Sequence, residues 1–235
     1  MKRFSWLVRP RTIWAPTLIG WALLLSMLAA PFVFWGIWGE PILCVTRRES
    51  TDILVVEGWG DEETLEAAAS EFKTGNYRWA VTTGGPNGEN WQQKRWTYAQ
   101  IAFDRLAAYG VARNKMIMAP APEVESQRTY TSALSAKQAL ADAGLRPNAL
   151  NLFTRGSHAR RSQLVYAKVF EPTTKVGVIS WLPEGAHKSP WWKSTVRAKD
   201  MLTETIGYLY EALLDSGRSD RTASVTSLDG KHQQP

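Results

Sequence analysis

The stretch Ala149-Leu-Asn-Leu-Phe-Thr-Arg-Gly-Ser-His-Ala-Arg-Arg-Ser162 decides the fold class of this chain. Its apolar run Ala149–Phe153 is typical of a buried strand, and Gly156 marks the turn that ends it. Ser157 stands where a helix N-cap is expected, so a helix is predicted from His158 to about Val169. A strand that passes through a short turn into a helix is the repeating unit of an α/β fold.

The same alternation continues through residues 52–215, which we assign to one domain. Apolar runs predict strands, and apolar positions at three- and four-residue steps predict helices. The predicted strands are Ile53–Glu57, Trp79–Thr83, Met116–Ala119, Ala149–Phe153 and Val176–Trp181. The predicted helices lie around Leu65–Phe72 and at about Glu89–Ala108, Ser126–Ala143, His158–Val169 and Lys193–Leu214, the last with an apolar face of Leu202, Ile206, Leu209 and Leu213. This order predicts a Rossmann-like three-layer sandwich with a mostly parallel sheet of about five strands, in the order 3-2-1-4-5.

An uncharged stretch, Thr17–Trp38, precedes the domain and is long enough to span a bilayer as a helix. We predict a cytoplasmic N-terminus at residues 1–12, a transmembrane anchor at 13–38 and a linker at 39–51. Four basic residues before the stretch favour a single-pass protein of the cytoplasmic (inner) membrane with its domain on the periplasmic side. A cleaved signal peptide is the alternative, although Pro31 directly follows its one small-residue site.

Charge and composition exclude several classes of function. The net charge is +6, but removing the four basic residues before the span leaves 24 basic against 22 acidic residues, or +2, too balanced for a nucleic-acid-binding surface. One cysteine excludes an internal disulfide framework. His158 and His187 lack metal-ligand spacing, so no metal site is predicted. The polar tail, residues 216–235, is expected to be disordered.

The first two strands end in residues suited to a ligand site. Because all strands of a parallel sheet end at one edge, the loops that follow them are the places where ligands bind. Glu57 is a candidate acid or base; the candidate ligand-binding residues are Gly58 and Trp59 after the first strand and Thr83, Gly84 and Gly85 at the second. Tight or flexible turns explain the glycines equally well, but they explain the carboxylate and the indole less well.

Two later segments add basic residues to this edge. Ser126, Arg128 and Thr129 stand at the start of the third predicted helix, where Ser126 is the expected cap. Arg155 and Arg161 flank His158, the candidate proton donor or acceptor, whose ordinary pKa lies near neutral pH. We expect the arginines to hold a phosphate or carboxylate. A solvated helix start with basic residues facing water remains the alternative.

The ordered set of motifs resembles the YdcF/ElyC/SanA-like family of envelope proteins (domain of unknown function 218). The resemblance rests on Asp52, Glu57-Gly58-Trp59, Thr83-Gly84-Gly85, Ser126-x-Arg128-Thr129 and Thr154-x-x-x-His158-x-x-Arg161. It implies a Rossmann-like sheet and a role in bacterial cell-wall precursor or lipid-carrier metabolism. The chain departs from the family pattern at Arg128, Thr131 and Ser132, where an asparagine and a Glu-Asn pair are usual.

Three classes of function compete at this stage. The first is an enzyme or binding protein for an anionic, lipid-linked or cell-wall intermediate, which the anchor and the basic strand ends favour. The second is a binding module for a nucleotide-type ligand such as S-adenosylmethionine, which the glycine loops permit. The third is a non-catalytic envelope scaffold. Fold by itself does not choose between them.

Overall fold

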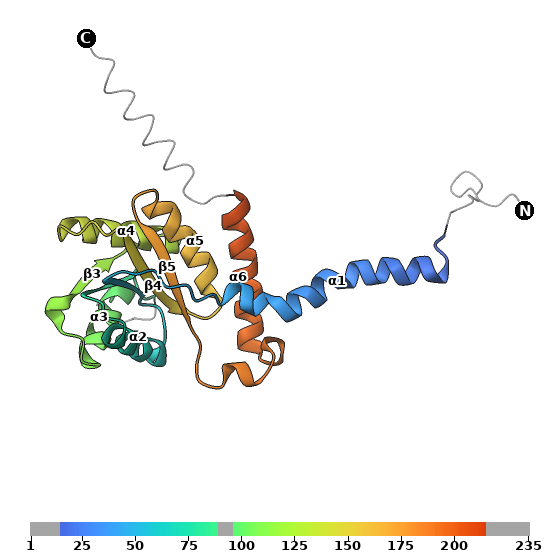
Figure 1. Ribbon diagram of the computed structural model, residues 1–235, viewed down its shortest axis with the longest axis horizontal. Helices are drawn as coiled ribbons and strands as arrows, with labels where there is room; N and C mark the ends of the chain where they lie inside the picture. Colours follow the sequence, from blue (N-terminus) through green and yellow to red (C-terminus); the bar gives the residue numbers. More distant parts are fainter. Residues whose placement is uncertain (1–14, 89–95, 215–235) are drawn as a thin grey trace, which may run out of the picture. The chain divides into compact units, whose positions relative to one another are not determined.

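The computed structural model describes residues 15–88 and 96–214 and contains two compact units, Met1–Gly39 and Glu40–Pro235 (Figure 1). The helix α1 (Leu18–Leu43) begins in the first unit. The helix is strongly apolar over a stretch of 18 residues, and none of that stretch is buried. Both its length and its composition suit a membrane span. Residues 13 and 14 of the predicted anchor, the predicted N-terminus and the predicted tail lie outside the described residues.

The second unit contains the predicted sheet. Its strands are β1 (Ile53–Glu57), β2 (Trp79–Gly84), β3 (Met116–Pro120), β4 (Ala149–Arg155) and β5 (Lys175–Trp181). Every described pair is parallel and the order is β3-β2-β1-β4-β5, which confirms the prediction. The central strand β1 is buried along its whole length, which explains why its sequence is apolar at consecutive positions.

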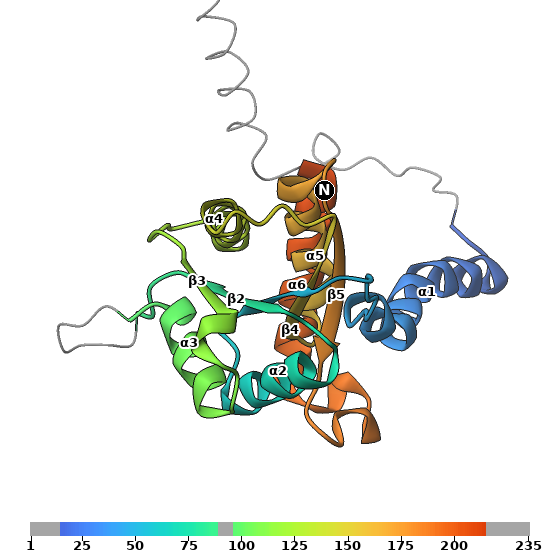
Figure 2. The same ribbon diagram turned by 60° about the vertical axis from the view of Figure 1, so that its left-hand side comes forward.

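Four helices complete the sandwich, with two on each face of the sheet (Figure 2). They are α2 (Glu62–Thr74), α3 (Tyr98–Ala108), α4 (Arg128–Asp142) and α5 (His158–Phe170). Successive residues of β1 contribute to opposite cores, because side chains alternate along a strand. Val55 packs with α4 and α5, whereas Leu54 packs with α2 and α3.

Two predicted helices begin later than the sequence suggested. Thr97 caps α3 by accepting a hydrogen bond from the amide of Gln100 at 3.1 Å. Residues 89–95 of the predicted helix lie outside the described residues. The cap of α4 is Gln127, in the left-handed conformation (φ 59°) and without a side-chain hydrogen bond, so the predicted Ser126 cap is wrong.

The segment predicted as a linker packs against the sheet. Arg47 and Val178 of β5 exchange two backbone hydrogen bonds, at 2.7 and 2.8 Å. The side chain of Asn151 accepts from the amide of Glu49 and donates to its carbonyl. Residues 40–51 therefore form part of the second unit, where these bonds satisfy backbone groups that a free linker would leave to water.

The last helix, α6 (Thr195–Leu214), packs against α5 with the face opposite to its apolar residues. Its buried residues are Met201 and Glu211, whereas the predicted apolar face of Leu202, Ile206, Leu209 and Leu213 is exposed. The apolar face does not pack on the core, because the surface that α5 offers is charged, as described below.

Candidate functional site

The candidate site lies where the chain order of the sheet reverses. The strand β1 is hydrogen-bonded to β2 on one side and to β4 on the other. The segments that follow β1 and β4 lead to helices on opposite faces, α2 and α5. Ligands of open α/β sheets bind in the crevice at such a switch point, outside the carboxyl ends of the strands. Glu57 ends β1 and His158 begins α5, so both belong to this point.

His158 is held between two carboxylates. Its Nδ1 lies 2.9 Å from Oε1 of Glu204, and its Nε2 lies 3.5 Å from Oε2 of Glu57. His158 is 8% exposed and Glu57 is 4% exposed. The ring of Trp59 meets the imidazole edge-on, with centroids 4.8 Å apart, and Trp59 remains 39% exposed. Trp59 therefore packs against the buried imidazole while staying partly exposed itself.

This environment keeps His158 protonated. Burial alone would lower the pKa of the imidazole, but the charge of Glu57 and the hydrogen bond to Glu204 outweigh burial and raise the pKa to about 9. Burial would likewise raise the pKa of Glu204, whereas its hydrogen bonds to His158 and Arg161 lower it to about 2. Burial would raise the pKa of Glu57 too, but the charge of His158 and the hydrogen bonds from neighbouring side chains, His158 and Ser162 among them, together outweigh burial and lower it. The raised pKa favours an imidazolium between two carboxylates at neutral pH, and Nη2 of Arg161 also lies 2.9 Å from Nδ1.

Arg161 completes the charge balance of the network. Its Nε donates to Oε2 of Glu204 at 2.7 Å and its Nη2 donates to Oε1 at 3.1 Å, a bidentate pair. Its Nη1 donates to Oγ1 of Thr129, in the first turn of α4, at 3.3 Å. Two cations and two carboxylates thus neutralise each other in a buried cluster, which we call the His158 network (Glu57, His158, Arg161 and Glu204).

Ser162 anchors the carboxylate of Glu57 from α5. Its hydroxyl lies 3.1 and 3.0 Å from the two carboxylate oxygens and donates to them. Ser162 stands four residues after His158 on α5, so one helix face presents both side chains to the end of β1. Glu57 is consequently oriented by one neutral donor and one cation.

The other predicted basic residues have different surroundings. Arg155 pairs with Asp61, the cap of α2, at 2.6 Å, and so joins the end of β4 to the segment that follows β1. Arg128 is exposed at the start of α4, and within the described residues its guanidinium has no hydrogen-bond or ion-pair partner. Ser126 is exposed in the turn before α4. Neither Ser126 nor Arg128 contacts the His158 network.

The predicted glycines have a packing role. A Cβ at Gly58 would overlap the carbonyl oxygen of Tyr98, and one at Gly84 (φ +146°) would lie 2.6 Å from the Cβ of Tyr98. The first turn of α3 thus closes over both glycines. Gly85 has ordinary room, with the nearest atom 3.4 Å away. Thr83 is fully buried and donates to the carbonyl of Ser132 on α4.

The sequence prediction missed Glu204 and Ser162. Glu204 belongs to a helix whose apolar residues suggested the opposite orientation. A usable signal was present: Glu204 and Glu211 are seven residues apart, as are Arg161 and Lys168 on α5, and the structure pairs them as Arg161–Glu204 and Lys168–Glu211. The helical period places Glu204 and Glu211 on one face of α6, and Arg161 and Lys168 on one face of α5. The interface between α5 and α6 is therefore ionic.

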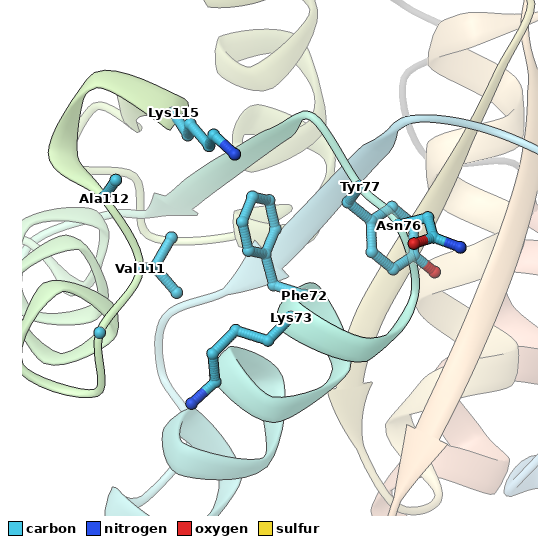
Figure 3. A pocket seen from close by; sticks show the side chains of 8 residues that line it. Phe72, Lys73, Asn76, Tyr77, Val111, Ala112 and Lys115 are labelled. Carbon is cyan, nitrogen blue, oxygen red and sulfur yellow. The ribbon is translucent and has the colours of Figure 1, made fainter.

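A separate hollow of about 430 Å³ lies at the other, amino-terminal edge of the sheet (Figure 3). Its lining comes from the end of α2 and from the segments that precede β2 and β3, with Phe72 at its centre and Lys73 and Lys115 at its rim. The His158 network does not open into it. Among the residues that the structure describes, no group of three His, Cys, Asp or Glu side chains is arranged to hold a metal ion.

Comparison with known proteins adds no family to this description. No protein-family model, no curated protein and no solved structure matches the chain. The resemblance to the YdcF/ElyC/SanA-like family stays a prediction from the motifs, and the function must be argued from the geometry of the site.

Proposed function

We propose that this chain is a membrane-anchored envelope-biogenesis protein that binds an anionic cell-wall or lipid-carrier intermediate at the switch point, where His158 donates a proton to it. The observation that carries the proposal is the buried imidazole of His158 held between the carboxylates of Glu57 and Glu204. Burying four charges is expensive unless they are fully paired, and a hydrophobic cluster of the same volume would serve stability as well. Strongly perturbed ionisable groups at a strand-end crevice are typical of functional sites.

The proposed chemistry uses His158 as a general acid. With a pKa of about 9 the imidazole carries its proton at neutral pH, so it is suited to give a proton rather than to take one. In the cleavage of a phosphoester or phosphoanhydride, the bond from phosphorus to the leaving oxygen breaks and Nε2 protonates that oxygen. Water or an acceptor hydroxyl takes the phosphoryl group, and solvent then reprotonates the imidazole. Glu204 holds the ring through Nδ1 and keeps Nε2 directed at Glu57 and the crevice.

Two exposed side chains support binding of an anionic ligand beside this acid. Arg128 is the neighbour in sequence of Thr129, which contacts Arg161, so the start of α4 brings a guanidinium without a described partner to the same edge. Trp59 offers a half-exposed ring next to His158. A guanidinium and an aromatic ring together suit a phosphate that is joined to an apolar or ring-shaped group.

The test compares His158→Gln and Glu57→Gln with Glu71→Gln. Glu71 is a matched control, because it is a partly buried carboxylate in an ion pair with Arg48 and lies outside the His158 network. Each full-length variant is expressed in a deletion strain at equal folded amounts, and growth under cell-wall stress and the pools of lipid-linked precursors are measured. We expect the first two variants to behave like the deletion and the control to behave like the wild type. Wild-type behaviour of all three would refute the proposed acid and leave a scaffold role.

A further inference from the structure

The outward face of α6 is apolar although the helix belongs to the second unit. Seven large side chains on it are exposed: Val196, Leu202, Ile206, Leu209, Tyr210, Leu213 and Leu214. Four of them, Leu202, Ile206, Leu209 and Leu213, follow the helical period and form one stripe, which we call the α6 stripe. Ile206, at its middle, is 69% exposed. Contiguous apolar surface of this kind marks an interaction site.

The charges of α6 are sorted between its two faces. Glu204 and Glu211 point inward to Arg161 and Lys168, so two of the three described carboxylates of the helix are kept away from the α6 stripe, and the third, Asp200, is exposed. Lys199 is exposed, as are Trp192 and Lys193 in the turn that precedes the helix. An apolar face bordered by lysines and tryptophan is the pattern of a helix that lies in the interface of an anionic bilayer.

One ion pair ties the start of α6 to the end of the membrane-span candidate. Arg197, in the first turn of α6, pairs with Glu40, the first residue of the second unit. The same guanidinium donates to the carbonyls of Ala186 and Ser189 and so holds the turn before the helix. Because Glu40 closely follows the uncharged stretch, chain connectivity alone keeps this end of α6 near any bilayer that α1 crosses.

We infer that α6 is a second membrane contact, with the α6 stripe lying in the headgroup region of an anionic phospholipid surface. The lipid would bury the apolar side chains of the stripe, which the domain leaves exposed. The anionic headgroups would pair with Lys193 and Lys199. Glu204 projects from the opposite side of the same helix into the His158 network, so the contact holds the site at the lipid surface. The inference does not depend on the chemistry of His158.

The test places a single environment-sensitive fluorophore on the full-length chain in vesicles of phosphatidylethanolamine and phosphatidylglycerol. Ile206→Cys carries the probe on the stripe, and Leu134→Cys carries it at a matched apolar position of α4, 42% exposed. Burial raises the pKa of the native Cys44 thiol to about 12, so labelling at neutral pH leaves it largely unmodified, and the unsubstituted chain gives the background. Lipids with brominated acyl chains serve as the quencher.

We expect brominated lipid to quench the probe at position 206 and to leave the probe at position 134 unchanged. Adding Leu209→Glu to Ile206→Cys should abolish the quenching, because a carboxylate on the stripe opposes insertion among anionic lipids. Equal water-exposed emission at both positions would overturn the inference. So would dry, unquenched emission at position 206 together with crosslinking between chains of the unlabelled Ile206→Cys variant, because that result would assign the stripe to a second copy of this chain.

Discussion

At the scale of single residues, the decisive property of this protein is the charge of His158. The imidazole is buried, yet its pKa is raised from 6.5 to about 9, because Glu57 and Glu204 together outweigh the loss of solvation. The folded state therefore binds this proton more tightly than the unfolded state does. The stability that results is fully present below pH 6.5 and is lost as the pH rises through the folded pKa.

This linkage predicts a pH-dependent stability of the full-length chain in detergent micelles. The free energy of unfolding should fall by about 3 kcal/mol between pH 6.5 and about pH 9, since a tenfold difference in proton affinity between the folded and unfolded states corresponds to about 1.4 kcal/mol. Denaturant unfolding at several pH values measures it. His158→Gln is the control and should lack this decrease. An equal decrease in the variant would assign the pH dependence to other groups.

At acid pH, the stability that the same network contributes changes with pH in the opposite direction. The pKa of Glu204 is lowered to about 2, so its contribution is present above its ordinary value of 4.5 and is lost as the pH falls toward 2. The network is thus most stabilising between about pH 4.5 and 6.5. Tertiary contact creates this window, because in an unfolded chain residues 57, 158 and 204 would titrate independently.

At the scale of elements, the loops after β1 and β2 depend on their contact with α3. Gly58→Ala should destabilise the domain by about 2–3 kcal/mol, because the new Cβ would overlap the backbone of Tyr98 and force α3 away from the sheet. Gly85→Ala is the matched control in the neighbouring loop and should change stability by less than about 0.5 kcal/mol, since its Cβ has room. Thermal unfolding compares the two; equal destabilisation would contradict the packing role.

The orientation of α6 shows that a helix can pack with the face opposite to the one that its hydrophobic pattern indicates. Its apolar positions recur at helical spacing, which normally identifies the core-facing side. The partner helix α5 presents Arg161 and Lys168, so the side of α6 with Glu204 and Glu211 turns inward. The charge pattern of two helices together, rather than the hydrophobic pattern of one, decided the packing.

At the scale of the whole molecule, we predict that α1 is retained as an anchor. Leu28→Arg should weaken membrane integration, because an arginine at the centre of a span costs about 2.5–3.5 kcal/mol. Resistance of the chain to alkaline extraction from membranes measures this. Leu134→Arg, the same substitution in the domain, should leave extraction unchanged. An isolated chain whose intact mass shows cleavage after Ala30 would instead identify a signal peptide.

The side of the membrane on which the domain lies has its own test. The basic residues before the span predict an exported domain. Reporters fused to the C-terminus should therefore be active only if they function outside the cytoplasm. Activity from a cytoplasmic reporter alone would contradict the predicted orientation and weaken the proposal of an envelope substrate.

The amino-acid sequence by itself determined the fold class, the strand order and the edge at which Glu57, Trp59 and His158 gather. These features follow from local periodicity and from the geometry of parallel strand–helix units, both of which are encoded in neighbouring residues. The strands therefore match their predicted ranges to within two residues. The starts of the helices at Tyr98 and Arg128 were harder to predict from the sequence, because capping depends on single residues whose conformation the pattern does not specify.

Only the tertiary structure decided the composition of the His158 network. Glu204 lies 46 residues from His158 along the chain, and Ser162 meets a carboxylate 105 residues away. Such contacts depend on how α6 turns against α5, which the charges of both helices set jointly. The glycines were interpreted as space for a ligand, whereas Gly58 and Gly84 give room to α3. Local sequence periodicity does not specify long-range packing. The protonation of His158 and the burial of the site therefore depend on the tertiary structure.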